Sequence, residues 1–453
     1  MSTSIPEKKS WWDAIEIYRR PRLIGIFGMG ISSGFPLTLV LSTLGYWLSQ
    51  EGVDAETIGL LAVVTMPYSL KFLWSPLIDW IKLPLMHKSF GRRRSWLFLI
   101  QAGLTAAVLF LGSTNPKEGA MLVGLGALLV SFMSASQDIV LDAYRIEILT
   151  DEEQPAGAAM IQFGYRIGNY ISGTGGLALA ALYDWHVAYY VLSLQVLCGV
   201  LPALLLGEPK RDGHELVEQE TEAVEHWLKD EVHAPTALSL FVENFYLSVI
   251  VPFKEFMSRH GWMLILLFII LLKIGDGMAS VMTPVLLVDL GFSNAEIIYA
   301  NKTVGAIALL IGIFVGGLLL KWTGTYRGLF IAAVLMMVSN LSFAVLNEVG
   351  YNVPLLAFTM GFENFASGLG GTLAIAYLSG LCNLAYTATQ YALLSSLASV
   401  GRGVLAAPSG FGYAEWGPTA FFIFTTIAAI PAIILLFWMR KLGTVSEDLR
   451  VKS

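Results

Sequence analysis

Charged side chains inside otherwise apolar stretches are the residues best suited to carry chemistry in this sequence. Asp138 and Asp142 are spaced i, i+4, which places both carboxylates on one face of a helix. At ~1.5 Å of rise per residue, Lys71 and Arg166 are expected at a similar depth in neighbouring helices. Two cations matched to two carboxylates predict a buried polar network.

Two interpretations of this network remain open. In the first, salt bridges lock the helices together and have no other role. In the second, the cations bind an anionic substrate and a carboxylate carries a proton. The carboxylate takes up the proton when it is desolvated and away from a cation, and releases it when a cation is near. The candidate proton carriers are Asp138, Asp142, Asp276 and Glu363.

A second group of charges lies further along the chain. Lys273 and Asp276 are three residues apart on one helix face, and Lys302 and Glu363 are expected at depths that allow them to pair. Within the apolar runs, cations outnumber deep carboxylates, and amide and aromatic groups lie near them, so a large anionic solute of sugar or peptide type is predicted. The candidate substrate-binding residues are Lys71, Arg166, Lys273, Lys302, Arg402, Gln137, Tyr144, Asn169, Asn301, Asn364, Asn383, Gln390 and Tyr391.

The elements that must position these residues are predicted from composition. Of 453 residues, 55% are hydrophobic and 14% are charged, whereas about 25% are charged in soluble domains. This excludes a soluble enzyme, a disordered chain and a coiled coil. Runs long enough to cross a bilayer as helices lie at about 23–48, 56–78, 95–113, 119–149, 157–182, 186–207, 262–289, 296–320, 328–347, 354–382, 387–414 and 417–439. We therefore expect an all-α integral membrane protein with twelve transmembrane helices.

The basic residues predict the orientation of these helices. If the N-terminus lies inside, 22 of the 28 Lys and Arg residues fall on the cytoplasmic side, so both termini are expected in the cytoplasm. The predicted parts are a cytoplasmic segment 1–22, a six-helix half 23–207, a cytoplasmic middle loop 208–260, a second half 261–439 and a cytoplasmic tail 440–453. Residues 236–256 are interpreted as an interfacial helix, with an inserted segment as the alternative.

The two halves resemble each other, which indicates the major facilitator fold. Similar segments end the fifth and eleventh spans and precede the second and eighth, at offsets of about 230–240 residues. The loop after the second span carries an aspartate and an arginine run, and the candidate cytoplasmic gate residues are Asp79, Arg92, Arg93, Arg94 and Arg145. The spacings Gly164-x-x-x-Gly168 and Gly312-x-x-x-Gly316 predict close helix contacts.

Several functional classes are not indicated by the sequence. Its six histidines lack metal-ligand spacing with cysteine, and no Gly-x-x-x-x-Gly-Lys-Ser/Thr loop is present. We predict no metal and no cofactor. A secondary transporter driven by an ion gradient is therefore expected.

Several motifs resemble those of the AmpG muropeptide permeases. They are Lys71-Phe72-Leu73-Trp74-Ser75-Pro76-Leu77-Ile78-Asp79, Ser134-Ala135-Ser136-Gln137-Asp138-Ile139-Val140-Leu141-Asp142-Ala143, Lys273-Ile274-Gly275-Asp276, Asn301-Lys302-Thr303, Glu363-Asn364, Ala388-Thr389-Gln390-Tyr391-Ala392-Leu393-Leu394-Ser395 and Val400-Gly401-Arg402. The matches run in order from about residue 20 to 440 and include the charged positions above.

The resemblance implies proton-coupled import of N-acetylglucosaminyl-1,6-anhydro-N-acetylmuramyl peptides from periplasm to cytoplasm. It also implies a monomer in the bacterial inner membrane, surrounded by lipid and without a nucleic-acid partner. In this family, uptake supports peptidoglycan recycling and β-lactamase induction. Related acetyl-CoA transporters share part of the pattern, so a facilitator for acetyl-CoA or another bulky anion is the alternative. A membrane-embedded enzyme or a sensor is a remoter one.

Overall fold

The computed structural model describes residues 16–53, 60–117, 119–209, 250–403, 405–406 and 408–445, with the side chains of all of these except 60–62, 120 and 401–403. Every regular element within these ranges is helical. The described residues of each predicted apolar run are helical for most of their length. The prediction of an all-α chain is confirmed.

The helices of the N-terminal half are interrupted at several points by short 3-10 or π segments. Proline begins or nearly begins several of them, where its missing N–H costs nothing because the first turn has no partner for it. The elements are η1 (Ile17–Arg19), α2 (Pro21–Thr38), η2 (Leu39–Thr43), α3 (Leu44–Gln50), η3 (Leu60–Thr65), α5 (Met66–Leu70), η4 (Lys71–Leu73), α6 (Ser75–Trp80), α7 (His87–Phe90), α8 (Arg92–Ser113), α9 (Ala120–Ile148), α10 (Gln154–Tyr170), η5 (Ile171–Gly175), α11 (Gly176–Leu182), α12 (Trp185–Ser193), η6 (Leu194–Val196) and α13 (Leu197–Leu206).

The C-terminal half is built in the same way. The elements are α16 (Val251–Ser258), α17 (Trp262–Leu271), α18 (Ile274–Asp289), α19 (Asn294–Ile298), η8 (Tyr299–Gly305), α20 (Ala306–Val349), α21 (Val353–Gly380), η9 (Leu384–Tyr386), α22 (Thr387–Gly403), α23 (Ser409–Trp416) and α24 (Pro418–Lys441). Within α20, Gly324 has φ 77° and ψ 176°, so two helices meet there at a turn that favours glycine.

Seven helical stretches of the described chain are long and apolar enough to span a bilayer, or eight if the bent pair Val353–Gly380 and Leu384–Val400 forms one span. The stretch Asn294–Val349 counts once in this number, although it turns at Gly324. These lengths are those of a multi-pass membrane protein. The total of twelve and the side on which the termini lie stay predictions.

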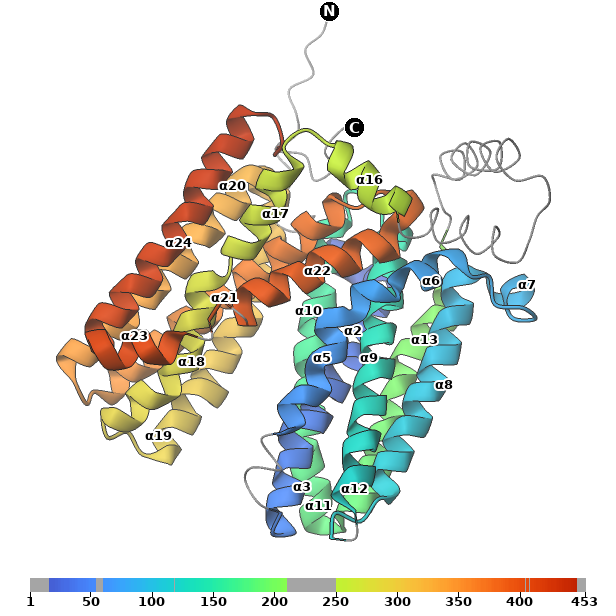
Figure 1. Ribbon diagram of the computed structural model, residues 1–453, viewed down its shortest axis with the longest axis horizontal. Helices are drawn as coiled ribbons and strands as arrows, with labels where there is room; N and C mark the ends of the chain where they lie inside the picture. Colours follow the sequence, from blue (N-terminus) through green and yellow to red (C-terminus); the bar gives the residue numbers. More distant parts are fainter. Residues whose placement is uncertain are drawn as a thin grey trace, which may run out of the picture.

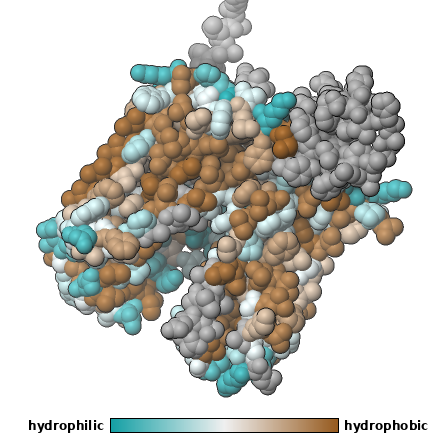
Figure 2. Space-filling view, viewed as in Figure 1, coloured by the Kyte–Doolittle hydropathy of each residue, from teal (hydrophilic) through white to brown (hydrophobic). Residues whose placement is uncertain are grey.

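The two halves touch at one end and separate at the other. In Figure 1, α16 and the last turns of α24 lie at the joined end, whereas α3, α11, α19 and α23 lie at the parted end. Figure 2 shows a gap between the two halves at the parted end, with hydrophilic atoms visible inside it. The outer flanks of both halves are largely apolar in this view, as expected of surfaces that face lipid.

Glycine allows the closest helix contacts within each half. A Cβ on Gly164 of α10 would lie 2.1 Å from the carbonyl oxygen of Phe27 in α2, and one on Gly312 of α20 would lie 2.2 Å from that of Phe365 in α21. Only glycine permits such approach of two backbones. Both contacts occur at the glycine spacings that the sequence singles out.

The middle segment is described only at its end. Residues 210–249, which hold most of the predicted interfacial helix, lie outside the described residues. The remaining part forms α16, which buries Val251, Pro252 and Phe256 and packs against α17 and α22.

Candidate functional site

A cavity of about 320 Å³ lies between the two halves, and we call it the inner pocket. Its walls come from α2, α9 and α10 on one side and from α17, α21 and α22 on the other. The lining residues are Ser33, Asp138, Asp142, Ile161, Gln162, Tyr165, Arg166, Ile269, Leu272, Lys273, Gly371, Ala374, Ile375, Tyr377, Leu378, Tyr391, Ser395 and Ala398. The pocket therefore brings together carboxylates, cations and tyrosines that the chain places in separate helices.

Three of the four charges predicted as a network in the N-terminal half line this wall, and the fourth, Lys71, interacts with two of them. Asp138 accepts a hydrogen bond of 2.6 Å from the Ser33 hydroxyl. Lys71 is buried at the 3-10 segment η4, and its positive charge acts on both Asp138 and Asp142. Arg166 lines the same pocket. Asp138, Asp142 and Arg166 therefore share the inner pocket, whereas the common depth of the four charges in the membrane stays a prediction.

Asp142 forms an ion pair with a residue that the sequence assigns to the gate. Arg145 Nη2 lies 3.5 Å from Asp142 Oδ1, one helical turn along α9. The same guanidinium group donates to the Ser379 hydroxyl at 2.9 Å and lies over the Tyr391 ring, both in the other half. Arg145 therefore links the floor of the pocket to the closed contact between the halves.

The C-terminal half contributes Lys273, which lies at the break between α17 and α18. Its charge acts on Glu363, and that carboxylate accepts a 2.7 Å hydrogen bond from Ser339. Lys302, expected to pair with Glu363, is exposed and lines a different pocket. The structure therefore gives the two residues different neighbours.

A second cavity of about 330 Å³ lies nearer the parted end, and we call it the outer pocket. Except for Lys302, its residues lie on the spans 21–50 and 154–182, and all of these but Arg166 lie nearer the parted end than the inner-pocket residues of the same spans. They are Thr38, Ser42, Thr43, Tyr46, Arg166, Asn169, Tyr170, Gly173, Thr174, Leu177 and Lys302. Arg166 lines both pockets, so the two adjoin at this residue.

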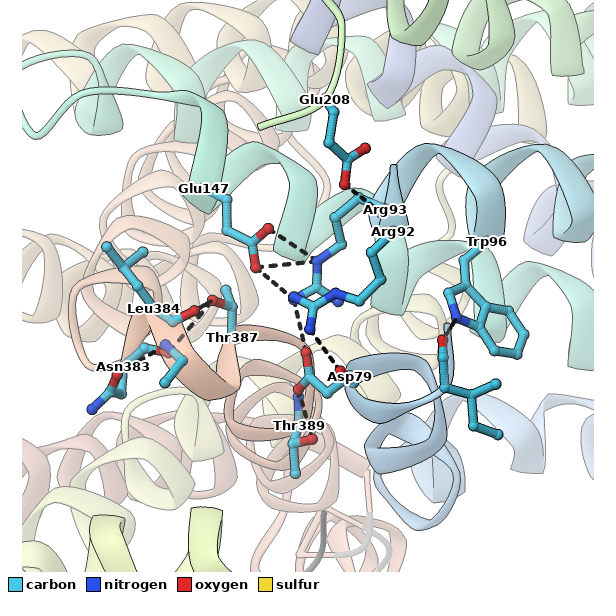
Figure 3. A network of polar contacts seen from close by, with 12 residues as sticks. Asp79, Arg92, Arg93, Trp96, Glu147, Glu208, Asn383, Leu384, Thr387 and Thr389 are labelled. Carbon is cyan, nitrogen blue, oxygen red and sulfur yellow. Dashed lines mark hydrogen bonds and ion pairs between the residues drawn. The ribbon is translucent and has the colours of Figure 1, made fainter. Parts of the chain in front are cut away.

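Beyond the inner pocket, toward the joined end, a buried ion-pair cluster crosses between the halves (Figure 3). We call Asp79, Arg93, Glu147 and Thr389 the gate cluster. Arg93 Nη2 lies 2.7 Å from Asp79 Oδ1, and its Nε lies 3.0 Å from Glu147 Oε2. Arg93 supplies the cation that Asp79 requires at a helix C-terminus, where the helix dipole disfavours a carboxylate.

The other oxygen of Asp79 carries the contact to the C-terminal half. Asp79 Oδ2 accepts from the Thr389 backbone N–H at 2.7 Å and from its hydroxyl at 2.8 Å. Thr389 is the third residue of α22, so this N–H belongs to the first turn, which has no partner within the helix. A carboxylate at a helix N-terminus is favourable. The first half thus caps a helix of the second half.

The arginine run that follows α7 is held by Glu208. This residue accepts from the backbone N–H groups of Arg93 and Arg94 at 2.8 and 3.1 Å. Gly91 has φ 82°, and a Cβ there would lie 2.4 Å from the Glu208 side chain. Arg92 donates to the Asp79 carbonyl oxygen at 2.7 Å, so the run supports the gate cluster from the same half.

Further contacts join the two halves. The Thr372 hydroxyl donates to Gln162 Oε1 at 3.1 Å, and the rings of Tyr18 and Phe314 lie 4.7 Å apart. Both contacts connect the N-terminal half to α20 or α21. The joined end is therefore closed by several polar and aromatic contacts.

Some predicted substrate-binding residues lie away from both pockets. Gln137 is fully buried and bonds Ser32 within its own half, and Tyr144 donates to the Gly207 carbonyl at 2.6 Å. Gln390 and Asn383 hold α16, through the Pro252 carbonyl and Glu255. For these four residues, the contacts support a structural role.

The remaining predicted positions have mixed placements. Asn169 lines the outer pocket and accepts from Thr38 at 3.0 Å. Asn364 donates to the Met360 carbonyl at 2.8 Å, within its own helix. Asp276 lies in the first turn of α18, and Asn301 lies in η8. The side chain of Arg402 lies outside the described ones.

Residues that the sequence analysis missed complete the contacts of the joined end. The carboxylates of Glu147 and Glu208 accept hydrogen bonds from the arginine run. Three other residues form hydrogen bonds between the halves: Ser379, Thr389 and Gln162. Gln162 stands in an apolar run, so its polarity was a usable signal. Glu147, Ser379 and Thr389 also stand in predicted apolar runs, and Thr389 belongs to a quoted motif. Only the tertiary contacts identify the roles of these residues and of Glu208.

Known proteins resemble this chain over most of its length. The family model described as Major Facilitator Superfamily matches residues 24–362. The "Putative transporter AmpG 4" of Rickettsia conorii is 33% identical over 426 residues, which cover 94% of this chain and 98% of that protein. The "Anhydromuropeptide permease" of Escherichia coli K12 is also 33% identical and covers 94% of this chain, matched over 81% of its own length.

Solved structures of low identity share the fold. The proton:xylose symporter XylE superposes with a TM-score of 0.70 at 13% identity, over 97% of both chains. The human organic anion transporter MFSD10 superposes with a TM-score of 0.63 at 14% identity, over 92% of this chain and 99% of the other. The arrangement of two helical halves is therefore that of a major facilitator.

Proposed function

The chain belongs to the AmpG family of the major facilitator superfamily, and on this basis we propose that it imports anhydro-muropeptides from the periplasm to the cytoplasm by proton symport. It is a transporter and not an enzyme. Twelve spans, cytoplasmic termini and a place in the bacterial inner membrane are part of the proposal. Peptidoglycan recycling is the process that such uptake serves.

The single observation that carries the proposal is the charged inner pocket between two halves that are joined at one end only. A site that opens to one side at a time is the requirement for alternating access. With the termini in the cytoplasm, the parted end faces the periplasm, and the gate cluster closes the cytoplasmic side. This conformation is the one that receives cargo for import.

The pocket chemistry suits this cargo. Tyrosines and carboxylates along the inner pocket can pack against sugar rings and accept hydrogen bonds from hydroxyl groups. Arg166, which lines both pockets, supplies positive charge for carboxylates. An anhydro-muropeptide carries both kinds of group.

Coupling to protons requires a carboxylate that changes its surroundings during the cycle. Asp138 and Asp142 fit this role because they line the pocket one turn apart, near Lys71 and Arg145. Opening of the joined end pulls Arg145 away from Ser379 and Tyr391, which changes the electrostatic surroundings of Asp142. Glu363, bonded to Ser339, is the second candidate.

The test uses purified protein in liposomes and labelled anhydro-muropeptide. An inward proton gradient should drive accumulation of the label, and a protonophore should abolish accumulation while leaving exchange with internal unlabelled cargo. Acetyl-CoA, the cargo of the alternative interpretation, is the control solute. Uptake of acetyl-CoA without uptake of muropeptide would overturn the proposed cargo, and accumulation that is insensitive to the protonophore would overturn proton coupling.

A further inference from the structure

The two pockets differ in charge. The inner pocket is lined by Asp138 and Asp142 together with Arg166 and Lys273, so its formal charges balance. Among the described residues that line the outer pocket are Arg166 and Lys302, and none of them is acidic. An anion is therefore favoured in the outer pocket over the inner one, where carboxylates repel it.

The outer pocket is also unusual in its backbone. Its wall includes residues of three π-helical segments: Ser42 and Thr43 in η2, Gly173 and Thr174 in η5, and Lys302 in η8. Such segments are rare and occur often at functional sites. They come from both halves of the molecule, so the outer pocket changes shape whenever the halves move.

The first two segments are bonded to each other. The Thr43 hydroxyl donates to the Ser172 carbonyl oxygen of η5 at 3.1 Å, and the Thr38 hydroxyl donates to Asn169 at 3.0 Å. These bonds fix the N-terminal wall of the pocket. Lys302 on the opposite wall is exposed, so its ammonium group is open to an incoming ligand.

The order of the pockets along the path follows from the helices. The inner pocket includes Ser33 and Arg166, and the outer pocket includes residues three to thirteen positions further along the same two spans, toward the parted end. A cargo that is longer than one pocket lies across Arg166 and occupies both. The two ends of the cargo then contact lining residues of different charge.

We infer that the site is divided into two subsites, with the outer pocket holding the carboxylates of the peptide arm and the inner pocket holding the uncharged sugars. This inference rests on the proposed function and adds the orientation of the cargo. The sugar hydroxyls donate to the aspartates and the rings pack on tyrosines, whereas the peptide carboxylates lie between Arg166 and Lys302. A cargo without the peptide then occupies the inner pocket alone.

The experiment pairs a change in the protein with a change in the cargo. Apparent affinities are measured in liposomes for three cargoes: the muropeptide, the same compound with its peptide carboxylates amidated, and the peptide-free anhydro-disaccharide. Lys302→Gln should weaken the first cargo about fivefold, the upper range for an exposed charge pair. The other two cargoes should be unaffected, and Lys302→Arg should restore affinity for the first.

Lys321→Gln is the matched control, because Lys321 lies in α20 and lines neither pocket. It should leave all three affinities unchanged. Equal weakening of the three cargoes by Lys302→Gln, or no weakening of the muropeptide, would overturn the inference while uptake by the unaltered protein still supports the proposed function. If the unaltered protein takes up none of the three, the proposed function fails and the inference fails with it.

Discussion

Replacement of Asp79 by asparagine should shift the protein toward the conformation that is open at the joined end. Asp79 accepts hydrogen bonds from both halves. The donors are Arg93 Nη2 at 2.7 Å in its own half, and the backbone N–H and hydroxyl of Thr389 at 2.7 and 2.8 Å in the other. Asparagine keeps the shape of the side chain but lacks the negative charge. In either orientation its amide NH₂ faces a donor, Arg93 on one side or Thr389 on the other. A hydrogen bond to a charged group contributes about 1.5–3 kcal/mol, so we expect a roughly 10- to 150-fold change in the ratio of the two conformations.

A second variant isolates the contact between the halves. Thr389→Val removes the hydroxyl and leaves the backbone N–H and the Arg93 pair in place. It should shift the same equilibrium in the same direction by about 1 kcal/mol, or roughly fivefold. The two variants together separate the bond across the interface from the ion pair inside the N-terminal half.

The assay is a distance distribution between spin labels at the parted end. Leu182 at the end of α11 and Val288 near the end of α18 are 76% and 69% exposed, so labels there do not disturb packing. The native cysteines Cys198 and Cys382 are free and are replaced first. As the joined end opens, the halves rotate and the labels approach, so the fraction of short distances should rise in Asp79→Asn.

Glu153→Gln is the matched control, because the partners of this buried carboxylate among the described residues, Arg20, Arg22 and Thr150, all belong to its own half. It should leave the distance distribution unchanged. Our reasoning is refuted if Asp79→Asn gives the distribution of the unaltered protein, or if Glu153→Gln shifts it as much.

Other expected outcomes concern coupling, binding, packing and pH. Replacing the coupling carboxylate by an amide should abolish gradient-driven accumulation but keep cargo exchange. If the neutral variants of all four predicted proton carriers still accumulate cargo, the proton is carried by another group. Replacing Arg166 by glutamine should weaken cargo binding roughly 10- to 100-fold at normal membrane abundance. Normal binding in this variant and in the glutamine variants of Lys71, Lys273, Lys302 and Arg402 would show that the site lies elsewhere. Gly164→Ala should cost about 1–3 kcal/mol in thermal stability because its Cβ meets a carbonyl of Phe27, whereas Gly45→Ala, with open space around it, should not. Burial opposes ionisation of Glu153, but hydrogen bonds from Arg20 and Thr150 outweigh it and lower the pKa of this carboxyl. The stability it contributes is therefore full above its ordinary pKa and lost as pH falls through the lowered value, so melting curves of Glu153→Gln should lack this loss.

The sequence by itself determined the helical character of the chain, the charged positions within it and the family. Apolar runs of bilayer length form helices, because a helix satisfies every backbone polar group internally. The position of Asp138 along its helix follows from residue counting, since each residue of an α-helix adds a constant rise. Lys71 lies in the 3-10 segment η4, where the rise differs. The close contacts at Gly164 and Gly312 likewise follow from local spacing.

Only the tertiary structure decided which side chains meet. Asp79 and Thr389 are 310 residues apart, and Arg145 and Ser379 are 234 apart, so no local pattern links them. Depth along a helix does not fix the direction in which a side chain points around the axis, and this is why Gln390, expected in the cavity, instead bonds α16. The division of the cations between two pockets depends on how the two halves pack against each other, and that contact is a property of the folded molecule as a whole.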